Sequence, residues 1–226
     1  MTQNLTIFIL AGGRGERLKP ITKSIPKPLI KINKKEILTY VIDHLNKFDF
    51  KDLYILTGYK YKLIDNFIKK KYKKNLRVKT IFTGINSDIS KRIKKALKYA
   101  SENILICYGD TMADIDLKKL KKLQKQKKDK IIISTFQYKS SFGIIKQKKN
   151  NEISNYLEKP KLDLFINIGY MLFKKEKLKK LDNHKSFESF LKNVIKKEKV
   201  FSNIHKGKHI TVNTVYELEQ AKKNLK

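Results

Sequence analysis

The sequence lacks several features that would point to other classes of protein. Its 226 residues include one cysteine (Cys107), no tryptophan, four prolines and nine glycines. A single cysteine excludes a disulfide framework and a cysteine-rich zinc site, and it favours a reducing compartment. Hydrophobic residues make up 40% of the chain, which is too many for a disordered tail.

Long apolar runs are also missing. No stretch approaches the roughly 20 apolar residues that a membrane-spanning helix needs. The first ten residues have no basic segment, and their apolar run is too short for a signal peptide. We therefore expect a cytoplasmic protein without a membrane partner, folded as a single domain over residues 1–226.

Positive charge is in excess, because 53 basic residues against 21 acidic ones give a formal net charge of +32. Such a surface can collect nucleic-acid phosphates. Arginine, whose planar guanidinium pairs with guanine edges and phosphates, accounts for only four of the 53. The lysines are spread along nearly every polar helix face. We interpret them as solvated surface charge and keep nucleic-acid binding as a lesser alternative.

Alternating apolar and amphipathic segments predict the fold. Five short apolar segments are typical of buried strands, and apolar residues at helical spacing lie between them. The strands are expected at residues 5–10, 52–57, 77–82, 104–108 and 130–136. This order predicts an α/β protein with a Rossmann-like, mostly parallel central sheet and helices on both faces.

The second half of the chain has a different pattern. Short strands at residues 142–146, 153–157 and 165–173 follow one another closely, which predicts antiparallel additions to the sheet. A helix at residues 187–195, a strand at 200–204 and a helix at 215–225 complete the chain.

A glycine-rich loop follows the first strand, where an open α/β sheet binds its ligands. Its residues are Leu10, Ala11, Gly12, Gly13, Arg14 and Gly15, and Arg17 and Lys27 follow on a proline-stiffened segment. Glycines let backbone N–H groups approach an anion closely. The spacing fits neither the dinucleotide-binding fingerprint nor a Walker A loop. We predict a cradle for a polyphosphate; the alternative is a glycine-rich turn with ordinary surface cations.

The motif Gly12-Gly13-x-Gly15-x-Arg17-Leu18, followed by Pro26-Lys27-Pro28, resembles the signature of the sugar-1-phosphate nucleotidyltransferases. These enzymes join a nucleoside triphosphate to a phosphomonoester and release pyrophosphate. Further similar segments cover almost the whole chain: Gly58-Tyr59-Lys60, Tyr108-Gly109-Asp110, Phe142-Gly143, Glu158-Lys159-Pro160 and Asn167-x-Gly169. The segments Thr83-Gly84 to Arg92-Ile93 and Tyr108-Gly109-Asp110-x-x-Ala113-Asp114 are most similar to glucose-1-phosphate cytidylyltransferases.

The resemblance implies a nucleotide-diphospho-sugar transferase fold, with a nucleotide-binding half (about residues 1–125) and an acceptor-binding half (about residues 126–226). It implies catalytic roles for Arg17, Lys27 and Asp110. The implied nucleotide-binding residues are Leu10, Ala11, Gly12, Gly13, Arg14, Gly15, Thr83, Gly84, Arg92 and Gly109. The implied acceptor-binding residues are Gly143, Glu158, Lys159, Asn167 and Gly169. For Glu158 and Lys159, a plain surface ion pair is the alternative.

A magnesium site is expected at Asp110, which ends a buried strand directly after a glycine. A helix cap is its alternative role, although Asp114 and Asp116 are better cap candidates. The resemblance implies a second metal-binding aspartate, and Asn213 stands in its place with a neutral carbonyl oxygen. The substitution is expected to weaken metal binding, and it motivates a second hypothesis, a non-catalytic nucleotide-binding relative.

The sequence thus predicts a Mg²⁺-dependent nucleotidyltransferase that makes precursors of surface polysaccharide. Its expected partners are a nucleoside triphosphate, with CTP favoured, and a small phosphomonoester. A sugar 1-phosphate, phosphocholine, a phosphonate and a phosphorylated amino acid all stay open as acceptors. The four histidines show no metal-ligand spacing, and Cys107 is expected to be a buried strand residue.

Overall fold

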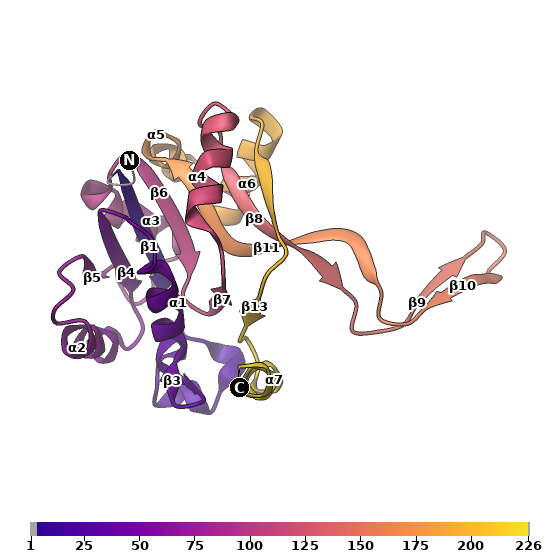
Figure 1. The fold of residues 1–226 in the computed structure, drawn as a ribbon, viewed down its shortest axis with the longest axis horizontal. Helices are drawn as coiled ribbons and strands as arrows, with labels where there is room; N and C mark the ends of the chain where they lie inside the picture. Colours follow the sequence, from indigo (N-terminus) through magenta and orange to yellow (C-terminus); the bar gives the residue numbers. More distant parts are fainter. Residues whose placement is uncertain (1–3, 226) are drawn as a thin grey trace.

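The computed structural model describes residues 4–225 and has a seven-stranded central sheet, in the order β12-β8-β11-β6-β1-β4-β5 (Figure 1). Six of these strands point the same way, and β11 runs antiparallel to both of its neighbours. The strands are β1 (Leu5–Ala11), β4 (Asp52–Thr57), β5 (Val78–Phe82), β6 (Asn103–Tyr108), β8 (Ile132–Lys139), β11 (Lys161–Lys174) and β12 (Phe201–His205). The predicted mostly parallel sheet is confirmed.

Helices cover both faces of this sheet, as predicted. One face carries α1 (Ile37–Leu45), α2 (Tyr61–Lys71) and α4 (Leu117–Gln126), and the other carries α3 (Ile89–Ala96), α5 (Lys175–Leu178) and α6 (Phe187–Lys197). Strand β1 shows why two cores form. Ile7 and Ile9 pack into the first core and Phe8 into the second, because successive side chains of a strand point to opposite faces.

The predicted antiparallel addition to the sheet is confirmed for β11 and wrong for the two strands before it. Residues 142–146 and 153–157 do not join the central sheet. Strands β9 (Ile144–Gln147) and β10 (Ile153–Leu157) pair with each other and project from the body (Figure 1). We call residues 141–159 the hairpin arm. Only β11 enters the sheet, and it lies between β6 and β8 rather than at an edge. Periodicity identified these strands but carried no information on their partners.

Short elements that periodicity missed connect the sheet to the C-terminal helix α7 (Val215–Asn224). Strand β7 (Thr111–Ala113) follows β6 and pairs with β13 (His209–Thr211), with Thr111 opposite Thr211. A second small ladder joins β2 (Lys31–Ile32) and β3 (Lys35–Glu36). The 3-10 helices are Glu16–Leu18, Ile21–Lys23, Lys27–Leu29, Leu97–Tyr99 and Lys179–Asn183.

Two expectations about single residues are confirmed and one is wrong. Asp116 caps α4 by accepting hydrogen bonds from the N–H groups of Lys118 and Lys119. Cys107 is fully buried, and burial raises the pKa of its thiol. Asp114 caps no helix; its carboxylate lies 2.9 Å from His205 Nε2.

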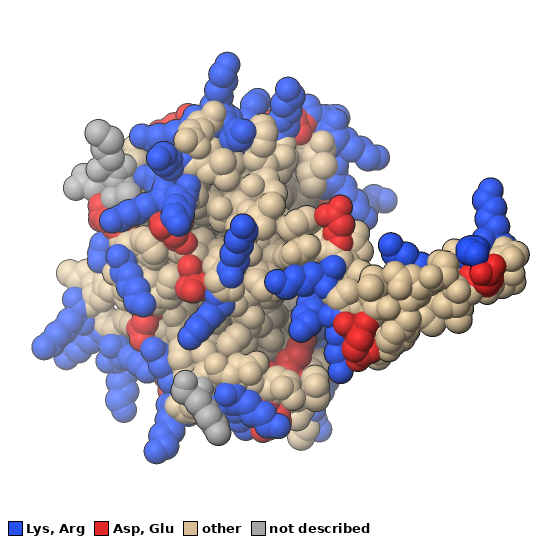
Figure 2. All heavy atoms as spheres, turned by 45° about the vertical axis from the view of Figure 1, so that its right-hand side comes forward, with Lys and Arg blue, Asp and Glu red and all other residues tan. Residues whose placement is uncertain are grey.

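Surface charge is dispersed over the face of the molecule that Figure 2 shows. In Figure 2 the lysine and arginine side chains are spread over the visible face and do not gather in one patch. This distribution supports the interpretation of the lysines as solvated charge. In the part of the chain that the structure describes, no helix is both long and apolar enough to cross a membrane.

Candidate active site

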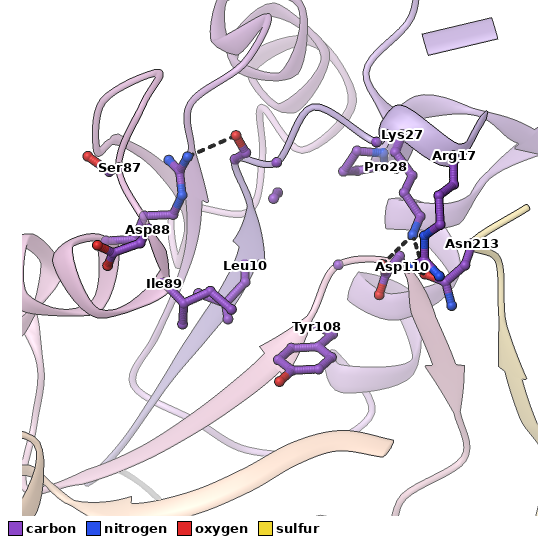
Figure 3. A pocket seen from close by; sticks show the side chains of 16 residues that line it. Leu10, Arg17, Lys27, Pro28, Ser87, Asp88, Ile89, Tyr108, Asp110 and Asn213 are labelled. Atoms are coloured by element: carbon purple, nitrogen blue, oxygen red, sulfur yellow. Dashed lines mark hydrogen bonds and ion pairs between the residues drawn. The ribbon is translucent and has the colours of Figure 1, made fainter. Parts of the chain in front are cut away.

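A pocket of about 390 Å³ opens where β1 and β6 end, at the carboxyl edge of the parallel strands. Of the predicted site residues, its lining contains Leu10, Ala11, Gly12, Gly13, Gly15, Arg17, Lys27, Arg92, Gly109, Asp110 and Asn213. Arg17, Lys27, Asp110 and Asn213 gather on one side, and Ser87 and Asp88 lie on the other (Figure 3). We call this the glycine-loop pocket.

Hydrogen bonds to its carbonyl groups hold the glycine loop in shape. The Gly12 carbonyl accepts from Arg92 Nη2 at 2.9 Å and from the Tyr59 N–H at 3.0 Å. Gly15 has φ 65°, in the left-handed region, and its carbonyl accepts from Thr22 Oγ1 at 3.1 Å. In a trans peptide the carbonyl and the next N–H point in opposite directions. The Gly13 N–H therefore points away from Arg92, and the shape of the loop is fixed by the protein itself.

Arg92 fastens three loops together beneath the pocket. Its side chain is almost fully buried, and Nη1 donates to the Thr57 carbonyl (3.1 Å), Thr83 Oγ1 (2.8 Å) and the Gly84 carbonyl (2.8 Å). Burial lowers the pKa of the guanidinium below its ordinary value. The sequence grouped Thr83, Gly84 and Arg92, and the structure does bring them together. Of these three residues only Arg92 lines the pocket; Thr83 and Gly84 bond to Arg92 and do not line the pocket.

Four polar side chains converge on the other side of the glycine-loop pocket. Lys27 Nζ lies 2.5 Å from Asp110 Oδ2 and 2.9 Å from Asn213 Oδ1. Arg17 Nη2 donates to the same Asn213 oxygen at 3.1 Å. Lys27 is 12% exposed, so its charge lies in a partly desolvated place where a phosphate would attract it strongly. Residues up to 196 positions apart in sequence thus form one polar cluster.

The same cluster has the chemistry of a metal site. Asp110 Oδ2 and Asn213 Oδ1 both lie within 3 Å of one cationic nitrogen, so the two oxygens face the same position. Both are hard oxygen donors, which Mg²⁺ prefers. Within residues 4–225, no group of three His, Cys, Asp or Glu side chains is placed to hold a metal. A cation here would need further oxygens from phosphates or water, as Mg²⁺ sites commonly have.

A second pocket, of about 560 Å³, adjoins the first and shares Arg17, Tyr108, Asp110 and Asn213 with it. Its further lining comes from the second half of the chain and from β7: Thr111, Ile166, Asn167, His209, Thr211 and Glu217. Asn167 was predicted, and its Oδ1 accepts from the Gly169 N–H at 2.9 Å. Gly169 has φ 75° and lies against the Tyr108 ring, where a Cβ would overlap the ring.

Four predicted acceptor-binding residues line neither pocket: Gly169, which packs against Tyr108, and three residues of the hairpin arm. Gly143, Glu158 and Lys159 are in the hairpin arm, and none of them lines either pocket as described. Glu158 and Lys159 are more than half exposed and 3.5 Å apart, and Glu158 also accepts from the Tyr156 hydroxyl. These contacts are local. A role in binding the acceptor stays a prediction for these three residues.

Arg14 does not line the glycine-loop pocket. Its guanidinium donates to Asn86 Oδ1 at 3.2 Å and stacks over the Tyr59 ring at 5.6 Å. Sequence reasoning missed Ser87 and Asp88 as lining residues. Asp88 caps the N-terminus of α3. An aspartate directly before a helix that starts near the ligand-binding edge of the sheet was the signal that could have identified it.

Comparisons with known proteins agree with this geometry. The profile of the family described as "Nucleotidyl transferase" matches residues 7–199. The chain belongs to this family. A D-glycero-alpha-D-manno-heptose 1-phosphate guanylyltransferase from Campylobacter jejuni is 33% identical over 202 residues, which cover 85% of this chain and 87% of that protein. Matches to several other curated proteins span about half of those proteins.

Solved nucleotidyltransferase structures share the fold. HddC from Yersinia pseudotuberculosis superposes with a TM-score of 0.74 at 25% identity, over 98% of this chain and 99% of that one. A UDP-glucose pyrophosphorylase complexed with UDP-glucose gives a TM-score of 0.73 at 20% identity, over 100% and 98%. The nucleotide-diphospho-sugar transferase fold implied by the sequence motifs is therefore confirmed.

Proposed function

We propose that this nucleotidyltransferase transfers a nucleoside monophosphate from a nucleoside triphosphate to a sugar 1-phosphate or a similar small phosphomonoester. The main support is that Arg17, Asp110 and Asn213 line both of the adjoining pockets. Lys27 also bonds to Asp110 and Asn213. Two substrates held in these pockets would meet at this polar cluster. The product would supply activated sugar for surface polysaccharide.

In the reaction, an oxygen of the acceptor phosphate attacks the α-phosphorus. A new P–O bond forms as the bond to the β-phosphate oxygen breaks, and pyrophosphate departs with the electron pair. No proton has to move, so the protein acts by positioning two anions and stabilising developing charge. We assign the triphosphate to the Gly12–Gly15 backbone, the departing pyrophosphate to Arg17, and the meeting point of the two phosphates to Lys27.

Asp110 and Asn213 are the residues that would hold Mg²⁺. When bound, the cation neutralises phosphate charge and so lowers repulsion between the two substrates. Lys27 occupies the position between these two oxygens in the free protein. When the nucleotide's phosphates bind here, the Lys27 ammonium would exchange Asp110 for a phosphate oxygen. Such an exchange keeps the lysine paired throughout.

The halves of the chain divide the work in this proposal. The glycine-loop pocket takes its lining from residues before 114 and from Asn213, which suits the nucleotide. The second pocket adds Ile166, Asn167, His209 and Thr211, which suits the acceptor. For the base we propose cytosine, on the strength of the segments that hold Thr83, Gly84 and Arg92. The guanylyltransferase from Campylobacter jejuni makes GTP the principal rival to CTP.

One experiment tests activity and base choice together. Pyrophosphate release is measured with CTP, GTP, UTP and dTTP in turn, each with Mg²⁺ and with glucose 1-phosphate, a heptose 1-phosphate or phosphocholine. We expect release only when both a triphosphate and an acceptor are present, with CTP the fastest. Faster turnover with GTP would overturn the cytosine assignment. Absence of release with every pair would overturn the proposed reaction.

Asn213 favours a second candidate, a nucleotide-binding protein without turnover, because an amide oxygen offers a metal no charge. This candidate is tested by thermal shift, since a ligand that binds the native state raises its melting temperature. CTP binding without pyrophosphate release, unchanged in the Asn213→Asp variant, would support it. Restored turnover in that variant would show instead that the site is a weakened catalytic one.

A further inference from the structure

A chain of three hydrogen bonds connects His209 to Asp110 through two threonines. His209 Nε2 lies 3.0 Å from Thr211 Oγ1, which lies 3.2 Å from Thr111 Oγ1. Thr111 Oγ1 in turn donates to Asp110 Oδ1 at 3.2 Å. The antiparallel ladder of β7 and β13 places the threonines opposite each other, so their contact follows from the register.

The direction of every bond in this chain is fixed by its last member. An ionised carboxylate only accepts hydrogen bonds, so Thr111 must give its one hydroxyl proton to Asp110. Thr211 must then give its proton to Thr111, and its oxygen is left to accept from His209. The imidazole must therefore carry a proton on Nε2. Each threonine hydroxyl donates one hydrogen bond and accepts one, so every bond in the chain donates in the direction from His209 to Asp110.

The surroundings of Asp110 divide its two oxygens between different tasks. Oδ1 receives the Thr111 hydroxyl, and Oδ2 faces Lys27. The Asp110 carbonyl also accepts from the Val212 N–H at 3.2 Å, and Tyr170 donates to the Thr111 carbonyl at 3.1 Å. The carboxylate is thus oriented from one side and leaves Oδ2 directed at the polar cluster.

We propose that Thr111, Thr211 and His209 are positioning residues that orient the Asp110 carboxylate, with His209 in its Nε2–H form as the terminal donor. The consequence for metal binding and turnover rests on the proposed function, whereas the assigned tautomer of His209 does not. The imidazole is held at the far end by its packing against the Phe136 ring, at 5.1 Å between centroids. Burial and the neighbouring His205 lower its pKa, which favours the neutral imidazole.

Two pairs of variants separate this role from simple packing. Thr211→Val keeps the shape of the side chain and removes the hydroxyl, whereas Thr211→Ser keeps the hydroxyl. His209→Phe keeps an aromatic ring against Phe136 without a donor, and His209→Gln restores an N–H donor. Thr135→Val is the matched control, because it removes another strand threonine hydroxyl that bonds to a hydroxyl, that of Ser202.

Mn²⁺ affinity is measured by calorimetry in the presence of a non-hydrolysable CTP analogue, next to kcat and the KM for the acceptor. Partners that orient a metal ligand commonly contribute 10–100-fold to metal affinity or activity. We expect Thr211→Val and His209→Phe to lose about tenfold in Mn²⁺ affinity and in kcat. Thr211→Ser and His209→Gln should recover Mn²⁺ affinity to within about twofold of the unchanged protein, and Thr135→Val should leave it unchanged.

Failure has distinct signatures. Mn²⁺ affinity that Thr211→Val leaves unchanged would overturn the inference, and so would a rise in the acceptor KM alone, because it would mean direct contact with substrate. If no substrate pair gives turnover, the proposed function fails, and the imidazole ¹⁵N shifts of His209 still test the chain. The Nε2–H tautomer supports it, and the Nδ1–H tautomer overturns it.

Discussion

The glycine loop and the hairpin arm both carry motifs of the same family signature, yet they are held in different ways. Gly12 is joined to Arg92 and Tyr59, from elements 80 and 47 positions away, by hydrogen bonds of 2.9 and 3.0 Å. Glu158 bonds to neighbours one and two positions away on an exposed hairpin. The loop side of the site is therefore fixed in the free protein, whereas only local contacts position the arm. A two-stranded hairpin by itself has little stability in water.

The largest effect should come from the polar cluster on the loop side. Lys27→Ala or Asp110→Ala removes a charge that faces both substrates, and the loss of one such group commonly costs about 10²–10³ in kcat. Pyrophosphate release is the measurement, and Lys146→Ala in the arm is the control. Turnover within threefold of the unchanged protein in both cluster variants would contradict the mechanism.

Arg92→Met should be the next most damaging change. It removes the guanidinium that donates to the Gly12, Thr57 and Gly84 carbonyls, at a cost of about 3 kcal/mol in the free energy of unfolding, although Gly12 and Thr57 keep other donors. Denaturant unfolding measures this cost. Arg77→Met is the control, since Arg77 lies at the surface and should change stability by less than about 1 kcal/mol. An equal loss of unfolding free energy in the two variants would show that the bonds from Arg92 to the three loops do not stabilise the protein more than a surface arginine does.

Two neighbouring glycines offer a sharper comparison within the loop. A Cβ on Gly12 would overlap the Arg92 guanidinium, whereas a Cβ on Gly13 meets nothing within 4 Å. We expect Gly12→Ala to destabilise the protein by about 2 kcal/mol and Gly13→Ala to change its stability by less than about 0.5 kcal/mol. Thermal unfolding of the two variants side by side is the check. A Gly12→Ala protein as stable as the Gly13→Ala protein would mean that the loop and Arg92 move apart easily.

The smallest effect on stability is expected in the arm. Glu158→Gln changes an exposed pair and should alter the free energy of unfolding by less than about 0.5 kcal/mol. If the arm contacts the acceptor, Glu158→Gln raises the acceptor KM by up to about tenfold, because one hydrogen bond to a charged group is lost. The affinity for the nucleotide stays the same. An unchanged KM would leave Glu158 and Lys159 as a plain surface pair.

The sequence predicted the parts of the molecule that local chemistry determines. Apolar runs gave β1, β4 and β6, and the glycine motif placed Arg17 and Lys27 beside a ligand pocket. It did not predict that β11 enters the middle of the sheet or that the arm leaves it. Strand partners depend on contacts between distant residues, and a run of apolar residues does not encode them.

The missed parts of the site have the same cause. Strands β7 and β13 are three residues each, too short for a periodic pattern, yet their pairing connects His209 and Thr211 to Asp110 through Thr111. Asn213 was identified from its motif, but its bonds to Lys27 and Arg17 came from the structure alone. Arg92 was identified from the resemblance of its segment to the cytidylyltransferases, and its buried bonds to three loops could not be seen in the sequence.

The central claim is that the glycine loop and the neighbouring Arg17 and Lys27 hold the nucleotide's phosphates. The most direct test is a crystal structure with a non-hydrolysable CTP or GTP analogue and Mg²⁺. The account predicts phosphates along the Gly12–Gly15 backbone, with Lys27 turned from Asp110 to a phosphate oxygen and the metal between Asp110 and Asn213. A nucleotide bound elsewhere, with the loop and the Lys27–Asp110 pair unchanged, would contradict it.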